Sequence, residues 1–144
     1  PMLRRATAHF ALLTGGRYRR LLTDEEQDPP VLRALREDGT ACPMDQLSEG
    51  ARDQLYLALR VAALEMQAEA AEPLPFVADD LLASFDEARA RAALELLAGL
   101  GRQVQVILFT HHAHVAELAA GLPGAAVLRM QATARIAEHA LPVG

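Results

Sequence analysis

The sequence predicts an α/β fold built around a parallel sheet. Two short apolar segments, residues 74–80 and 104–109, have the length and composition of buried strands, and residues 87–100 between them have the apolar period of a helix. Residues 114–122 and 125–130 continue the alternation with a second helix and a third strand. Such an order predicts right-handed crossovers and a parallel sheet, whose carboxyl edge is where ligands bind.

Length, composition and charge restrict the class of protein. The 144 residues suffice for one domain with its own core, and a hydrophobic content of 51% argues against disorder. The net charge of -5 argues against a nucleic-acid-binding surface that works by bulk electrostatics. We expect no membrane segment, since no apolar stretch is long enough and no signal-peptide pattern occurs. The single cysteine, Cys42, excludes an internal disulfide and fits the cytoplasm.

The basic residues have one unusual property. All 14 of them are arginine, and the chain contains no lysine. A phosphate-binding loop of the form G-x-x-x-x-G-K-[ST] needs a lysine, so this chain cannot contain one. Because Pro1 is not an initiator residue, we expect the chain to be part of a longer protein.

The first 46 residues predict a helix followed by a small β-region. Residues 2–14 have helical apolar spacing, and a Thr-Gly-Gly sequence stops the pattern. A strand over 17–22 and an acidic, proline-ended loop over 24–30 follow. Residues 31–36 and 40–42 flank a glycine-containing turn, which predicts a β-hairpin. The apolar positions of the helix are Leu3, Ala6, Phe10 and Leu13.

A long helix is predicted to begin just after Ser48 and to reach residue 70. Ser48 and Gly50 are typical of helix starts, where free backbone N–H groups and the helix dipole favour an anion. Taken alone, a serine at the start of a helix more often caps the helix than binds phosphate. The apolar stripe of this helix is Leu55, Leu59, Ala62, Ala63 and Met66.

Two adjacent carboxylates, Asp79 and Asp80, lie where the strand predicted within residues 74–80 should end. Two carboxylates at the edge of a sheet suit a hydrated Mg²⁺ ion and a water to be activated, as nucleotide hydrolysis requires. The alternative is a strand that ends in a solvated acidic turn. A loop over 81–86 leads to the next helix, whose apolar face is Ala93, Leu96, Leu97 and Leu100.

Histidines follow the strand over 104–109. His111 should lie at the same sheet edge as Asp79, because both residues follow neighbouring parallel strands. His111, His112 and His114 could suggest a metal site, but successive side chains should diverge on a strand-to-helix turn. One histidine beside a phosphate is the better functional interpretation, and a surface histidine cluster is the alternative.

Three segments in fixed order resemble the C-terminal half of an ABC-type ATPase head. They are residues 47–50 (Leu-Ser-Glu-Gly), residues 76–80 with 84–86, and residues 107–111. The order is most similar to coiled-coil ATPases of the SMC and chromosome-repair group, in particular the YhaN-like bacterial members. The resemblance covers about residues 9–130, and residues 10–18 are similar to the segment where the coiled coil re-enters the head.

The resemblance implies a role for each matching residue. In this family the first segment is the signature motif, the strand with its acids is the Walker B motif, and the histidine is the switch histidine. Glu49 replaces the usual second glycine of the signature, and Asp80 stands where many members have the longer glutamate. The implied roles are nucleotide contact in trans for Ser48, Glu49 and Gly50, Mg²⁺ binding through water for Asp79, catalytic base for Asp80, γ-phosphate contact for His111, and dimer interface for Ser84 and Asp86.

The resemblance also implies the larger assembly. Residues 1–46 would be a lead-in helix and hairpin, and residues 47–130 the core of a single C-terminal lobe. The intact protein would be an ATPase that uses Mg²⁺ and ATP, whereas this chain alone would be inactive. Its partners would be the N-terminal lobe of the same protein, a second head and, through the intact protein, DNA, in repair or chromosome maintenance. The alternatives are a non-catalytic interaction module and a different Mg²⁺-dependent phosphotransfer domain that uses Asp79 and Asp80.

Overall fold

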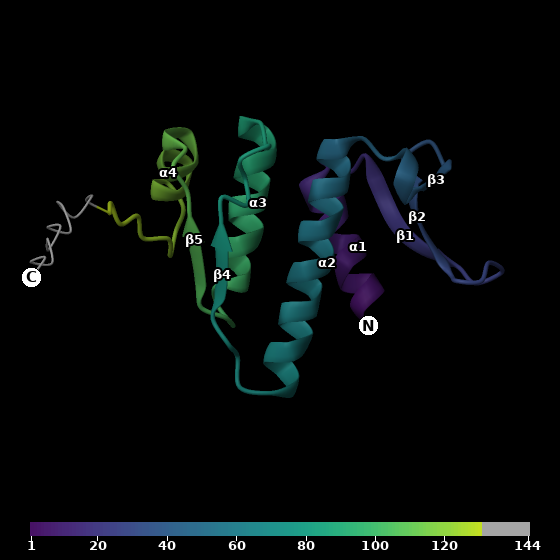
Figure 1. Ribbon diagram of the computed structural model, residues 1–144, viewed down its shortest axis with the longest axis horizontal. Helices are drawn as coiled ribbons and strands as arrows, with labels where there is room; N and C mark the ends of the chain where they lie inside the picture. Colours follow the sequence, from purple (N-terminus) through teal and green to yellow (C-terminus); the bar gives the residue numbers. More distant parts are fainter. Residues whose placement is uncertain (131–144) are drawn as a thin grey trace, which may run out of the picture.

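The computed structural model describes residues 1–130 and contains two small sheets with four helices (Figure 1). The first sheet is antiparallel, and the second is a parallel pair of strands. The antiparallel strands are β1 (Tyr18–Asp24), β2 (Val31–Arg36) and β3 (Ala41–Pro43), and the parallel strands are β4 (Phe76–Asp79) and β5 (Val106–Phe109). The helices are α1 (Met2–Leu13), α2 (Glu49–Ala70), α3 (Glu87–Leu100) and α4 (Ala113–Ala120), and a short 3-10 helix, η1 (Met44–Gln46), precedes α2.

Helix α1 forms where the apolar period predicts it. Ala6, Phe10 and Leu13 are buried, and the Phe10 ring stacks on Tyr18 of β1 with centroids 5.0 Å apart. The helix ends because the Thr14 hydroxyl donates to the Phe10 carbonyl and two glycines with positive φ follow. The predicted helix and the strand after it are confirmed.

The predicted hairpin is also confirmed, and it belongs to a larger sheet. Strands β2 and β3 pair antiparallel around a turn where Gly39 has a φ of 85° and Asp38 accepts from the Thr40 amide at 2.8 Å. Strand β1 pairs antiparallel with β2 on its other side. The first 46 residues therefore form a three-stranded sheet against α1.

Helix α2 starts where predicted, but its buried stripe is broader and rotated. Leu55 and Ala62 are buried, whereas Ala63 is exposed and Leu59 and Met66 are only partly covered. The reason is that α2 packs against both α1 and α3, so two sides of the helix are covered. The buried residues are Ala51, Gln54, Leu55, Leu57, Ala58, Val61 and Ala62.

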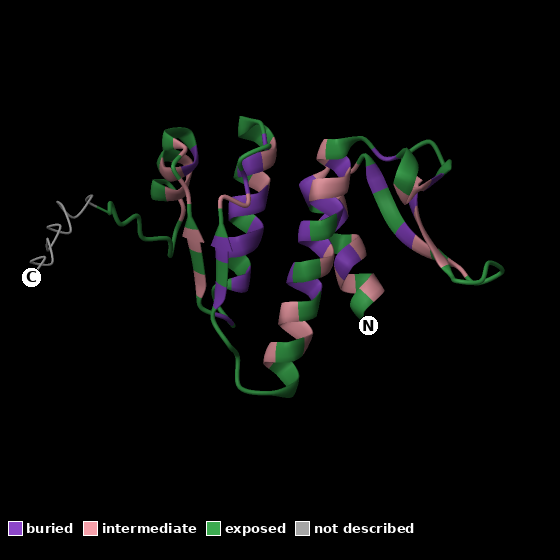
Figure 2. Ribbon diagram, in the orientation of Figure 1, coloured by how far each residue is buried: buried purple, intermediate pink, exposed green. Residues whose placement is uncertain are grey.

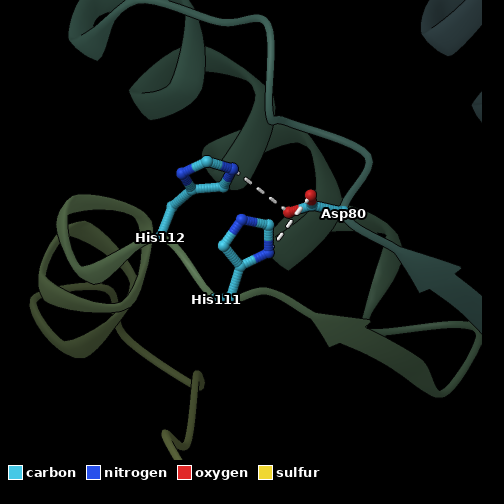
Figure 3. Close-up of side chains that lie close together, drawn as sticks. All are labelled: Asp80, His111 and His112. Carbon is cyan, nitrogen blue, oxygen red and sulfur yellow. Dashed lines mark ion pairs between the residues drawn. The ribbon is translucent and has the colours of Figure 1, made fainter.

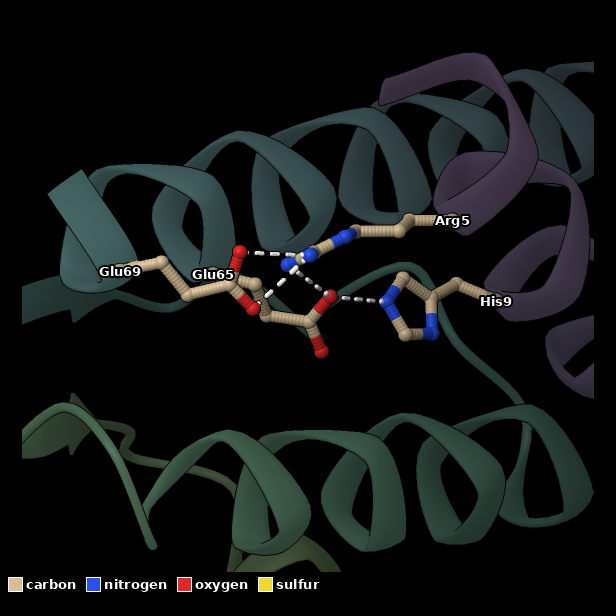
Figure 4. Close-up of polar contacts among 4 residues, drawn as sticks. All are labelled: Arg5, His9, Glu65 and Glu69. Atoms are coloured by element: carbon tan, nitrogen blue, oxygen red, sulfur yellow. Dashed lines mark hydrogen bonds and ion pairs between the residues drawn. The ribbon is translucent and has the colours of Figure 1, made fainter. Parts of the chain in front are cut away.

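Polar contacts complete the pairing of α1 with α2 (Figure 4). Arg5 donates to both carboxylate oxygens of Glu69, at 2.8 and 2.6 Å, and His9 Nε2 lies 3.0 Å from the Glu65 carboxylate. At the C-terminal end of α1, the buried side-chain amide of Gln54 in α2 donates to the Leu13 carbonyl. These contacts fix the register of the two helices.

The parallel pair has the predicted order and direction, but it is buried on one face only. Strand β4 pairs with β5 in a register that sets Asp79 opposite Phe109. Phe76 and Ala78 are buried, whereas Val77 is 56% exposed and Phe109 is 42% exposed (Figure 2). The prediction of buried strands is therefore confirmed only in part, since among the described residues helices cover one face of the pair and the other face is open.

The predicted third strand is wrong. Residues 125–130 adopt no regular structure, and Leu128 in this segment is 88% exposed. Gly124, with a φ of 81°, begins a segment that leaves the sheet rather than returning to β5 (Figure 1). An apolar sequence becomes a strand only when it pairs, and this one has no partner among the described residues. The parallel sheet thus has two strands here, and the tail beyond residue 130 lies outside the described residues.

The two remaining predicted helices are confirmed. Helix α3 spans the predicted residues with Ala93, Leu96, Leu97 and Leu100 buried, and α4 follows β5. No helix among residues 1–130 is long and apolar enough to cross a bilayer.

Candidate functional site at the carboxyl edge of the parallel strands

One end of the molecule collects the segments that the sequence singles out. Strands β4 and β5 both point toward this end, and α2 and α3 both begin there (Figure 1). The topology explains this arrangement, because a helix that connects two parallel strands must run back along them. The end therefore combines two strand carboxyl ends with the N-termini of α2, α3 and α4, and His112 is the N-cap of α4.

Asp80 lies immediately beyond β4 in an uncommon backbone conformation. Its amide donates to the Phe109 carbonyl at 2.8 Å, so the chain remains attached to β5 for one residue after the strand ends. Its φ is 51°, in the left-handed region that aspartate tolerates better than most residues. The carboxylate faces the residues that follow β5 (Figure 3).

Two histidines meet this carboxylate (Figure 3). His111 Nδ1 lies 3.3 Å from Asp80 Oδ2, and His112 Nε2 lies 3.4 Å from Asp80 Oδ1. The Thr110 hydroxyl is 3.5 Å from Asp80 Oδ1 and accepts from the His112 amide at 3.1 Å. The prediction that the strand ends bearing Asp79 and His111 are adjacent is confirmed by the strand register, which sets Asp79 opposite Phe109, whereas the carboxylate that contacts His111 is that of Asp80.

The expectation that successive histidine side chains diverge is wrong for His111 and His112. Their ring centroids lie 4.1 Å apart, and both rings turn toward Asp80. His111 is 76% exposed, but His112 and Asp80 are largely covered. His114 is exposed and lies outside this group. From the sequence, His112 is a candidate only as part of a possible metal site with His111 and His114, and its contact with Asp80 is a finding of the structure.

Asp79 has a different environment from its neighbour. It occupies the same open face of β4 as Val77 and is exposed. Among the described residues, no hydrogen bond or ion pair engages its carboxylate. Two adjacent carboxylates thus separate, one toward solvent and one toward the histidines.

The segment 47–50 begins α2 as a capped helix start. Ser48 is the N-cap and accepts from the Ala51 amide at 3.3 Å, and both Ser48 and Glu49 are exposed. Gly50 lies against the guanidinium of Arg89, and a Cβ atom at this position would be 3.0 Å from Arg89 Cζ. Because residue 50 is a glycine, the Arg89 side chain of α3 can cross the start of α2.

The loop over 81–86 contacts the same helix start. Ser84 Oγ donates to Asp53 Oδ2 of α2 at 2.9 Å. Asp86 caps α3 by accepting from the Arg89 amide at 2.9 Å, and its other oxygen lies 3.5 Å from Arg89 Nε. Ser84, Asp86 and the segment 47–50 are thus neighbours. Among residues 1–130, no hydrogen bond or ion pair joins this group to Asp80 and His111.

Known proteins resemble this chain in sequence and in fold. No family model matches the chain. The chain is 35% identical over 117 residues to the uncharacterized protein YhaN of Bacillus subtilis (strain 168), which covers 79% of this chain. It spans only 12% of the length of YhaN.

Solved SMC head structures share the fold. An SMC ATPase studied for ATP-driven dimerization and DNA-stimulated activation superposes with a TM-score of 0.66 at 19% identity, over 82% of this chain and 71% of that one. An Smc head bound to the C-winged helix domain of ScpA gives 0.64 at 22% identity, over 81% and 36%. The SMC head domain from Thermotoga maritima gives 0.59 at 20% identity, over 81% and 40%. The resemblance drawn from the sequence is confirmed.

Proposed function

Since the chain is a relative of YhaN with the fold of part of an SMC head domain, we propose that it is the C-terminal lobe of a head that binds and hydrolyses ATP. The observation that carries this proposal is the carboxyl edge of the parallel pair. There Asp79, Asp80 and His111 follow two adjacent strands, and α2 and α3 begin at the same end of the molecule.

The carboxylates at this edge fit two separate tasks. Asp79 is exposed and unpaired among the described residues, so its oxygens are available to a hydrated Mg²⁺ ion, which prefers oxygen ligands and keeps several waters. When bound, Mg²⁺ would neutralise charge on the phosphates. The Thr110 hydroxyl donates to the Asp80 carboxylate, and His111 Nδ1 lies 3.3 Å from it. These two contacts orient the carboxylate to take a proton from water. His111 is exposed, and we propose that it contacts the γ-phosphate.

The segment 47–50 supports contact with nucleotide held by a second head. Ser48 and Glu49 are exposed at the start of a 22-residue helix, where free N–H groups and the dipole favour phosphate. Ser84 and Asp86 lie beside this segment and would line the same interface. ATP would then join two heads, which we propose form a homodimer.

The setting of the head follows from the same proposal. The N-terminal lobe of the same protein would supply the phosphate loop, because this chain has no lysine for it. One of the similar structures comes from work on DNA-stimulated SMC ATPases, and we propose DNA repair or chromosome maintenance for the intact protein. The second candidate is a non-catalytic module that keeps the lobe, which is favoured by the short side chain of Asp80.

Substitution of Ser48 tests the interface while preserving the helix cap. Aspartate and asparagine both cap helices well, but only aspartate brings a negative charge toward phosphate. We expect Ser48→Asp to abolish ATP-dependent dimers of the intact protein in gel filtration with ATP and Mg²⁺, and Ser48→Asn to retain them. Both variants should melt like the parent. Dimers that survive Ser48→Asp unchanged would exclude this segment from the nucleotide interface.

A further inference from the structure

Asp80, His111 and His112 together offer three metal-ligand atoms from the ends of β4 and β5 (Figure 3). One carboxylate oxygen and two imidazole nitrogens all lie within 4.8 Å of one another. We propose that these three residues bind a divalent transition-metal ion, for which Zn²⁺ is the representative. The proposal depends on this geometry alone and stands whether or not the head hydrolyses ATP.

The two distances from Asp80 to the histidine nitrogens match ligand separations around a tetrahedral ion. Zinc bonds to histidine nitrogen and carboxylate oxygen measure about 2.0–2.2 Å, which sets neighbouring ligand atoms of a tetrahedron roughly 3.3–3.5 Å apart. The measured separations from Asp80 are 3.3 Å to His111 Nδ1 and 3.4 Å to His112 Nε2. The two contacts involve different oxygens of Asp80, and one ligand atom from each residue lies within 4.8 Å of the others. A single ion could therefore contact all three side chains after the rings and the carboxylate close in on it.

Hydrogen bonding accounts less well for the same geometry. A charge-assisted N–H···O bond is normally about 2.7–2.9 Å long, so both histidine contacts are long for that purpose. His112 Nε2 is buried and has no hydrogen-bond partner despite the nearby carboxylate. A buried ring nitrogen normally has a partner, and a metal ion between it and Asp80 would supply one.

The ligand types select the class of metal. Imidazole nitrogen favours Zn²⁺, Cu²⁺, Ni²⁺ and Fe²⁺, whereas Mg²⁺ and Ca²⁺ prefer oxygen ligands. The Thr110 hydroxyl contacts Asp80 and accepts from the His112 amide, which is the kind of support that orients ligands around a metal. His111 is exposed, so water would complete the coordination sphere on that side.

Metal at this position would weaken the proposed base role of Asp80. A bound cation favours the ionised form of a carboxylate, so Asp80 would be a much weaker base toward water while it holds the ion. If the proposed ATPase function holds, the ion would therefore inhibit ATP hydrolysis. It would bind at the same edge of the sheet where Asp79 would bind Mg²⁺.

Titration of the metal-free chain with Zn²⁺ tests the site directly. We expect one saturable site by calorimetry, and Co²⁺ absorption should report the same 1:1 stoichiometry. Asp80→Asn and His112→Ala should each weaken binding by at least about 10-fold, since even outer-shell changes at metal sites cost about 10–100-fold. Mg²⁺ at the same concentration should not compete.

Two matched variants separate this site from nearby groups. Asp79→Asn removes the adjacent carboxylate, and His114→Ala removes the adjacent exposed histidine, yet both should leave Zn²⁺ affinity unchanged. Circular dichroism of all variants confirms that they fold. The proposal is overturned if Zn²⁺ does not saturate one site, if Asp80→Asn and His112→Ala bind like the parent, or if affinity depends on His114.

Discussion

At the scale of single residues, Arg5 and Glu69 form a close ion pair between α1 and α2 (Figure 4). The hydrogen bond from Arg5 is the main cause that lowers the pKa of Glu69 below its ordinary value of 4.5, and the same bond raises the pKa of Arg5. A carboxylate with a lowered pKa stabilises the folded chain fully above its ordinary value. That contribution disappears as the pH falls through the lower, folded value.

Glu69→Gln should therefore make the free energy of unfolding fall less steeply as the pH is lowered. We expect the parent and the variant to differ most above pH 4.5 and to converge as the pH falls below it. Urea unfolding measured at a series of pH values checks this expectation. Glu72→Gln, an exposed residue just beyond α2, is the matched control. A Glu69→Gln profile with the same pH slope as the parent would contradict the linkage.

The residues of the site were only partly predictable. An apolar strand that ends in two acids predicts Asp79 and Asp80 at a sheet edge, and the next strand predicts His111 there. The left-handed φ of Asp80 has no sequence signal, because aspartate can adopt several turn conformations. That angle brings the carboxylate to both histidines, so the partner role of His112 required the structure.

At the scale of elements, the open face of the β4–β5 pair is the most exposed apolar feature near the site (Figure 2). Val77, Ile107 and Phe109 lie on it, and all three are exposed. In the proposed head, the N-terminal lobe would cover this face. An uncovered apolar sheet face and free strand edges favour association between copies.

The chain should therefore self-associate in a concentration-dependent way. Light scattering is the measurement, and Val77→Glu should shift the chain toward monomer by placing a charge on the face. Leu12→Glu, which changes an exposed leucine on α1, should have little effect. A strictly monomeric parent at high concentration would count against the missing-lobe interpretation.

Elements with a local start signal and an apolar period could be predicted well. Helix α3 spans the expected residues because Asp86 caps it and four spaced apolar residues define its buried face. The segment over 125–130 fails for the opposite reason, because a strand depends on a partner that the segment itself does not specify. The rotated stripe of α2 likewise depends on two neighbours, α1 and α3, that its own period cannot reveal.

At the scale of the whole molecule, β4, β5, α2 and α3 bring all the candidate residues to one end (Figure 1). Within the described chain these residues form two groups, one around Asp80 and one around Ser48. A head that dimerises around ATP explains two groups, since one would serve the nucleotide of its own head and the other the nucleotide of the partner. The central claim is thus that Asp80 promotes ATP hydrolysis in the intact protein.

The decisive measurement is phosphate release by the intact protein carrying Asp80→Asn, made together with ATP binding. Asparagine keeps the size of the side chain but cannot accept a proton from water. General-base catalysis contributes about 10²–10⁴-fold, so we predict a loss of kcat in that range, with ATP affinity retained and ATP-bound dimers accumulating. Turnover by Asp80→Asn at the parent rate would contradict the claim.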